Sequence, residues 1–160
     1  MAAARGYLAR TQQVDGSWCP LWFGNEHHPA QANPTYGTAR VVTETLDARG
    51  GRWLAAAMAA DGGVGAAAGL PPSIEETALT VDALATLATR TTDAGLRSRA
   101  TTAVEAGVRR LVAVTEEGSR FDAAPIGLYF AKLWYSEEVY PLAFTVAALE
   151  RAAALARLAQ

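Results

Sequence analysis

Aromatic side chains are concentrated near the end of the chain, and their ring faces suit one kind of chemistry. The face of an aromatic ring attracts a cation that lies over it. The cluster consists of Tyr129, Phe130, Trp134, Tyr135 and Tyr140. Two interpretations stay open: a wall that stabilises a positively charged species, or a helix packed into the core. Tyr129 and Tyr135 are six residues apart and do not share one helical face cleanly.

A metal or phosphate site has less support from the residues. Adjacent His27 and His28 lack the i, i+4 spacing of a helical zinc site, and Cys19 is the only cysteine. We interpret the segment around Glu26 as a solvated loop and predict no metal and no cofactor. The glycines of residues 62–65 have no strand before them and no Lys-Ser/Thr after them, so they indicate a turn rather than a phosphate loop.

Composition and charge restrict the possible partners. The formal charge is −2 and no basic block occurs, so nucleic acid is not an expected partner. One cysteine excludes an internal disulfide and favours a reducing compartment, so we expect a cytoplasmic protein. The longest apolar run, Pro141 to Leu149, is shorter than the ~20 residues that span a membrane. The abundance of alanine predicts a single all-α domain over residues 1–160.

The chain contains three related segments, near residues 5–18, 51–64 and 108–120. Leu8 and Asp15 recur as Leu54 and Asp61, and both offsets are 46 (54 − 8 and 61 − 15). A weaker copy begins at Leu111, 57 residues after Leu54. Periods of this size are typical of stacked helical repeats. We therefore expect helices in antiparallel pairs that bury their apolar faces by stacking.

Each copy predicts a helix, a glycine turn and a second helix. In the first copy Gln12 is expected to hydrogen-bond across the turn at Asp15 and Gly16, with the Trp18 ring lying over the repeat. The second helices are predicted at residues 36–48, at residues 73–89, and from residue 126 onward. Pro141 should break or kink the last of these, with helix resuming towards the C-terminus.

These features resemble the triterpene cyclase family, in particular squalene–hopene cyclases. The segment from Leu8 to Trp18 matches the family's QW repeat: an aromatic residue or Leu, three residues, Gln, then Gly-x-Trp. Residues 36–38, Tyr-Gly-Thr, resemble a segment that follows this repeat in the family. Residues 126–130 and 139–142 resemble its C-terminal aromatic stretch. In the second and third copies the Gln and Trp positions are replaced.

The resemblance implies part of an (α/α)6-type barrel, an apolar polyprene substrate such as squalene, and contact with one face of a membrane. In this family a protonated alkene starts a cascade of ring closures, and aromatic rings stabilise the cations. Residues that would line the substrate cavity by this resemblance are Trp22, Tyr36, Tyr129, Trp134 and Tyr135. For Trp22, a loop aromatic covering the edge of the core is an equal alternative.

The family's Asp-x-Asp-Asp acid motif is absent. The nearest sequence is Ser73 to Ala78, which contains Glu75 and Glu76. By resemblance either glutamate is a candidate proton donor. The alternative, which we favour from the sequence, is a pair of exposed acids in the first turn of a helix, with Ser73 and Glu76 in capping-box spacing. An exposed glutamate is not strong enough as an acid to protonate an alkene.

Two classes of function follow. The first is the C-terminal segment of a terpene cyclase, inactive alone because it lacks the acid, which requires a missing upstream half or self-association. The second is a non-catalytic helical module that binds an apolar ligand or a partner. A truncated relic without an independent role is a third interpretation.

Overall fold

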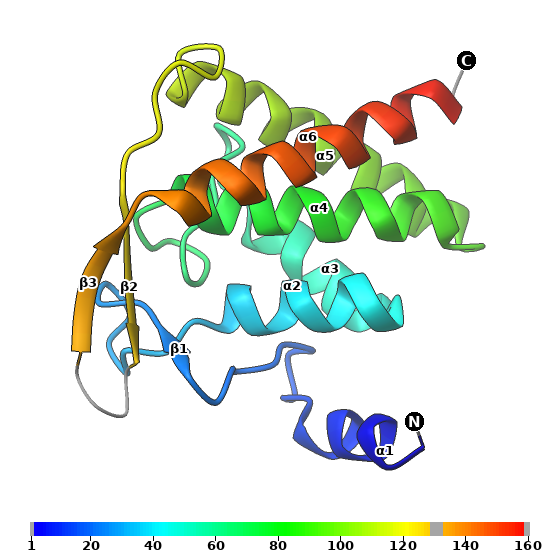
Figure 1. The fold of residues 1–160 in the computed structure, drawn as a ribbon. Helices are drawn as coiled ribbons and strands as arrows, with labels where there is room; N and C mark the ends of the chain where they lie inside the picture. Colours follow the sequence, from blue (N-terminus) through cyan, green and yellow to red (C-terminus); the bar gives the residue numbers. More distant parts are fainter. Residues whose placement is uncertain (1, 129–132, 159–160) are drawn as a thin grey trace.

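The computed structural model describes residues 2–128 and 133–158. Its elements, in chain order, are α1 (Ala2–Thr11), β1 (Phe23–Gly24), α2 (Pro34–Thr45), α3 (Ala48–Ala57), α4 (Ile74–Arg90), α5 (Ala94–Val114), β2 (Ala124–Leu128), β3 (Leu133–Glu137) and α6 (Val139–Leu158). Helices make up most of the described chain and pack around α4, which confirms the predicted all-α class (Figure 1).

Helix α4 is the centre of the fold. It contacts α2, α3, α5 and α6, and every residue from Ile74 to Ala88 is buried. The Ser73 hydroxyl caps its first turn by accepting a hydrogen bond from the Glu76 N–H at 3.0 Å. No glycine or proline interrupts the helix, so the backbone stays regular along its length. The predicted helix at residues 73–89 is therefore confirmed almost to the residue.

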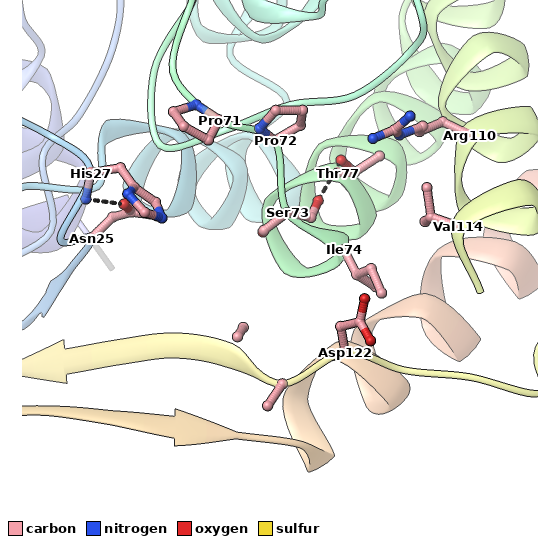
Figure 2. A pocket seen from close by; sticks show the side chains of 12 residues that line it. Asn25, His27, Pro71, Pro72, Ser73, Ile74, Thr77, Arg110, Val114 and Asp122 are labelled. Atoms are coloured by element: carbon pink, nitrogen blue, oxygen red, sulfur yellow. Dashed lines mark hydrogen bonds between the residues drawn. The ribbon is translucent and has the colours of Figure 1, made fainter.

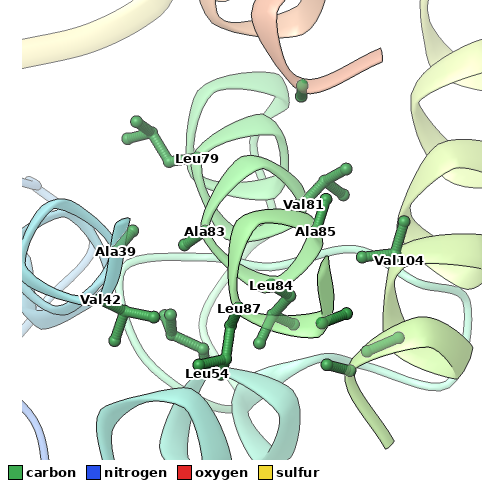
Figure 3. Packing of buried hydrophobic residues seen from close by; sticks show 14 of the residues in the cluster. Ala39, Val42, Leu54, Leu79, Val81, Ala83, Leu84, Ala85, Leu87 and Val104 are labelled. Atoms are coloured by element: carbon green, nitrogen blue, oxygen red, sulfur yellow. The ribbon is translucent and has the colours of Figure 1, made fainter. Parts of the chain in front are cut away.

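The core around α4 combines long and very small side chains (Figure 3). Leu84 and Leu87 pack against Leu54 of α3, and Val104 of α5 lies beside Ala85. Small residues let the helix axes approach closely, while the leucines fill the space between them. Two glycines mark close approaches to α4: an added Cβ would overlap the Leu87 side chain at Gly51 of α3 and the Val81 side chain at Gly107 of α5.

The first two glycine turns have the same geometry. In the first, the Gln13 N–H donates to the Ser17 carbonyl at 2.9 Å and Gly16 has a φ of +99°. In the second, the Ala59 N–H donates to the Gly63 carbonyl at 2.9 Å and Gly62 has a φ of +85°. These positions are 46 residues apart, so the repeat seen in the sequence is also a repeat of backbone conformation.

The third turn is different. Glu116 and Glu117 both have positive φ, at 49° and 58°, before Gly118 at 88°. Gly118 N–H still donates to the Thr115 carbonyl, as the glycines of the other turns do three residues back. The one-residue shortening noted in the sequence removes the aspartate position, and the chain compensates with two left-handed glutamates.

The predicted helix from residue 126 is wrong. Strands β2 and β3 form an antiparallel hairpin with Ile126 opposite Tyr135, and β1 pairs with β2 to complete a three-stranded sheet at one end of the molecule (Figure 1). Pro125 and Gly127 disfavour a helix here. Residues 129–132, and with them Tyr129, Phe130 and Lys132, lie outside the described residues.

Pro141 does not break a helix. Helix α6 begins at Val139, so Pro141 lies in its first turn, where a missing N–H breaks no intrahelical bond. The predicted helix at 36–48 is also divided: α2 ends at Thr45, Leu46 takes a left-handed conformation, and Asp47 caps α3 by accepting from the Gly50 N–H at 2.7 Å.

Helix α6 is long and apolar enough, by length and composition alone, to cross a membrane. This corrects the expectation from the sequence, which counted only the run to Leu149. Thr145 and Ala148 of α6 are buried, whereas Leu142 and Val146 are 45% and 49% exposed. The helix thus packs through one narrow face and leaves an apolar face uncovered within the described chain.

We predict that Gly107→Ala destabilises the protein. The added methyl would overlap Val81, and overpacking of a core costs about 1–3 kcal/mol. The better helix propensity of alanine recovers up to about 1 kcal/mol of this. Gly95→Ala in the first turn of α5 is the control, because its nearest neighbour would be an Asp93 oxygen at 3.4 Å. Urea unfolding of both variants tests this, and equal stability of the two would contradict it.

Candidate functional site

The first turn of α4 carries two adjacent buried carboxyl groups. Glu75 is 4% exposed and Glu76 is 3% exposed. The interpretation of these residues as exposed first-turn acids is therefore wrong, because α2, the 25–33 loop and the C-terminal segment pack over this end of α4. The capping box itself is confirmed, since the Ser73 hydroxyl also donates to Oε2 of Glu76.

Glu76 lies in a cage of hydrogen-bond donors. The side-chain amides of Asn25 and Asn33 both donate to its Oε1, at 2.8 and 2.9 Å. Burial raises the pKa of Glu76, and these two amide donors act in the opposite direction by stabilising the carboxylate. The side chain is thus polar and buried, with donors around both oxygens.

Glu75 has a different environment. Among the described residues its carboxyl has no hydrogen-bond or ion-pair partner. Burial, together with the nearby carboxyls of Glu76 and Glu137, raises its pKa from 4.5 to about 8. At neutral pH Glu75 is therefore mainly a neutral carboxylic acid that holds a proton. Buried carboxyl groups with a raised pKa are found at many acid–base sites.

Aromatic rings lie around the same end of α4. Tyr36 of α2 packs against Phe23 of β1 with ring centroids 4.7 Å apart, and Tyr140 packs against Phe144 within α6 at 5.6 Å. Burial raises the pKa of Tyr36, and Glu75 and Tyr140 are both close enough to contribute to that shift. Tyr36 is therefore near both Glu75 of α4 and Tyr140 of α6.

A cavity of about 270 Å³ lies on the other side of the Glu76 cage (Figure 2). Ser73 and Thr77 form its wall at the start of α4, Asn25 and His27 lie at one end, and Arg110 lies at the other. Arg110 is already paired with Asp61 at 3.0 Å. The cavity contacts the hydrogen-bonding partners of Glu76 but is not lined by the aromatic residues predicted from the sequence.

Those predicted lining residues fall in several places. Trp22 is 58% exposed, and Tyr36 and Trp134 are half-buried. Tyr135 is described by its backbone, which pairs with Ile126. Only Tyr36 is placed beside Glu75. The sequence analysis did not predict Asn25 and Asn33 as site residues. The irregular loop that they flank was the one feature of the sequence that could have pointed to them.

The residues of the first repeat form a connected group. Gln12 donates across its turn to the Gly16 carbonyl at 3.1 Å and to Asp47 at 2.9 Å, and the Trp18 indole N–H donates to the Leu8 carbonyl at 2.8 Å. Asp15 accepts from the Trp53 indole at 2.9 Å. Partial burial raises the pKa of Asp15, but hydrogen bonds from Ser17 and Trp53 lower it further, so that the pKa lies below its usual value. These contacts join the first repeat to α3.

Within residues 2–128 and 133–158 no group of three or more His, Cys, Asp or Glu side chains is placed to hold a metal ion. Cys19 is exposed, and His27 faces the cavity beside Asn25 rather than a second ligand.

Comparison with a solved structure identifies the fold. The ent-copalyl diphosphate synthase from Streptomyces platensis superposes with a TM-score of 0.60 over 94% of this chain, at 24% sequence identity. The chain has a terpene cyclase fold. It spans only 26% of that synthase, and the likeness does not single out squalene–hopene cyclases. No protein-family profile matches the chain. No curated protein matches it by sequence.

We predict that folding stability falls as pH rises, through Glu75. Its pKa is higher in the folded than in the unfolded state, so the stability it contributes is complete below pH 4.5 and is lost as pH rises through about 8. Glu75→Gln should lack this loss, and near pH 9 should be more stable than the unchanged protein by on the order of a few kcal/mol.

Urea unfolding at about pH 5, 7 and 9 measures this. The control is Glu105→Gln, which makes the same change at an exposed position of α5. An unchanged pH dependence in Glu75→Gln would show that Glu75 is not protonated in the folded protein.

Proposed function

We propose that this chain is a segment of a terpene cyclase and that Glu75 is its proton donor. The observation that carries the proposal is a buried carboxyl, Glu75, that keeps its proton at neutral pH and has no hydrogen-bonding partner among the described residues. Because a raised pKa makes Glu75 a weaker acid than an exposed glutamate, transfer of its proton requires strong stabilisation of the cation that forms. The sequence alone suggested an inactive segment, because Asp-x-Asp-Asp is absent. The buried Glu75 offers an acid at the corresponding place, the start of the helix after a glycine turn.

The reaction would begin with transfer of the Glu75 proton to a terminal alkene carbon. The O–H bond of Glu75 breaks, the alkene π electrons form the new C–H bond, and a tertiary carbocation remains. The carboxylate left on Glu75 then attracts the cation. Tyr36, which packs against Phe23, is the aromatic group that we expect to stabilise positive charge near Glu75.

The substrate class is an apolar polyprene. Squalene is the substrate that the resemblance favours, and the solved neighbour is named as a synthase of ent-copalyl diphosphate. Both a polyprene hydrocarbon and a polyprenyl diphosphate therefore belong in the assay. For a protein of the cytoplasm, contact with the membrane surface where such a substrate dissolves follows from the resemblance alone.

We predict that Glu75→Gln removes cyclisation. The protein, in the longest form that its gene encodes, is incubated with squalene or with a polyprenyl diphosphate in micelles, and cyclic products are measured by gas chromatography and mass spectrometry. Loss of a general acid lowers the rate about 100- to 10,000-fold. Glu105→Gln should keep full activity. Product formed equally by Glu75→Gln would exclude Glu75 as the acid.

A complete site requires more chain than these 160 residues. The remainder of a helical barrel would cover the apolar face of α6, which includes Leu142 and Val146. The alternative function, a non-catalytic module that binds an apolar ligand or partner, is favoured by the same face. Absence of cyclic product from the full-length protein with either substrate, together with binding of the polyprene, would support that alternative.

We predict that the isolated 160-residue chain self-associates through this face. Exposed apolar surface that another helix layer normally covers drives association in water. Sedimentation velocity should show dimers or larger species, and a Leu142→Lys/Val146→Lys variant should be monomeric. A monomeric unchanged chain at high concentration would contradict the proposal that α6 packs against further helices.

A further inference from the structure

The 25–33 loop supplies the two amides that hold Glu76. Asn25 and Asn33 come from opposite ends of this loop, and both donate to the same oxygen, Oε1. Both asparagines are buried, at 3% and 4% exposed. The loop therefore delivers two buried donors to one carboxylate oxygen of α4.

The carbonyl oxygen of each side-chain amide fixes the orientation of that amide. The Asn25 Oδ1 accepts from the His27 N–H at 2.8 Å, and the Asn33 Oδ1 accepts from the Tyr36 N–H at 3.0 Å. With each Oδ1 committed to a backbone donor, the NH₂ group is the part that faces Glu76. An NH₂ group only donates, so Oε1 of Glu76 must accept twice and has no place for a proton.

Glu75 has no such donors. The charged and titratable groups near the pair are Glu137 of β3 and Tyr36 of α2, both close to Glu75, and His27 of the loop, close to Glu76. Arg40 and Tyr140 lie close to Tyr36. Glu137 opposes ionisation of Glu75, whereas His27 favours ionisation of Glu76. Two adjacent buried carboxyls do not both ionise readily, so a single proton is divided between unequal partners.

We propose that Asn25 and Asn33 are positioning residues that keep Glu76 as the carboxylate and so leave the proton of the pair on Glu75. Neither asparagine touches the reacting atoms. Their effect is on which of the two glutamates is the acid. The use of that proton rests on the proposed function, but its location does not.

The test uses serine substitutions, because serine retains what each asparagine does for the backbone. Asn33→Ser keeps an N-cap for α2, and Asn25→Ser keeps a short acceptor for the turn at His27, while both remove the NH₂ donor. Asp93→Ser is the control, since it exchanges the N-cap of α5 far from the pair. Melting curves establish that each variant is folded.

The measurement is the pH titration of the side-chain carboxyl ¹³C signals of Glu75 and Glu76 by NMR. In the unchanged protein Glu76 should ionise first and Glu75 last. In Asn25→Ser/Asn33→Ser the acid dissociation constant of Glu76 should fall about ten- to hundredfold, since two donors to a charged group are lost. The constant of Glu75 should rise as the proton is shared. Asp93→Ser should reproduce the unchanged titration.

The proposal would be overturned if the acid dissociation constant of Glu76 in the double variant stayed within about twofold of its value in the unchanged protein. Should the double variant not fold, Glu76→Gln serves in its place, and Glu75 should then ionise at lower pH because its charged neighbour is gone. An unchanged Glu75 titration in that variant would also overturn it. These outcomes need no turnover, so they are distinct from failure of the cyclase assay.

Discussion

Burial of α4 on all sides is the constraint on which the rest of the structure depends. Water cannot solvate the acidic side chains of a helix that is buried on all sides. Each acid must therefore be neutral, hydrogen-bonded or paired with a cation. Asp82 is paired with Arg151 of α6, although burial still raises its pKa. Glu76 is hydrogen-bonded by two asparagines of the 25–33 loop and by Ser73, which caps its helix. Glu75 has neither kind of partner, and the remaining solution is to keep its proton.

The repeats explain how α4 becomes enclosed. The Trp18 N–H donates to the Thr38 hydroxyl of α2 at 2.9 Å, and the Val64 N–H donates to the Thr77 hydroxyl of α4 at 3.0 Å. The first two glycine turns are thus attached to the first turns of α2 and α4 by the same contact, from a backbone N–H to a threonine hydroxyl. Stacking these units places the second copy of that helix, α4, between the first copy and the C-terminal helices.

The sequence predicted the features that depend on neighbouring residues, but not those that depend on contacts between distant parts of the chain. The Ser73 cap, the glycine turns and α4 follow from side chains within a few residues of each other. The hairpin was missed because β2 and β3 depend on pairing with each other and with β1, a hundred residues earlier. Burial of Glu75 was missed for a similar reason. Its cover comes from α2 and from the segment near Glu137, and neither is visible in the six residues around it.

The aspartates of the first two glycine turns, Asp15 and Asp61, each bind a side chain of a later repeat, but the donor differs. Asp15 accepts from the Trp53 indole, and Asp61, 46 residues later, is paired with Arg110, 57 residues after Trp53 (110 − 53). The first contact involves a neutral donor, whereas the second involves a full cation that is one-third exposed. Dissolved ions screen the attraction between two charges far more than a hydrogen bond to an indole. Rising ionic strength should therefore weaken the Asp61–Arg110 contact between the second and third repeats before it weakens the Asp15–Trp53 contact between the first and second.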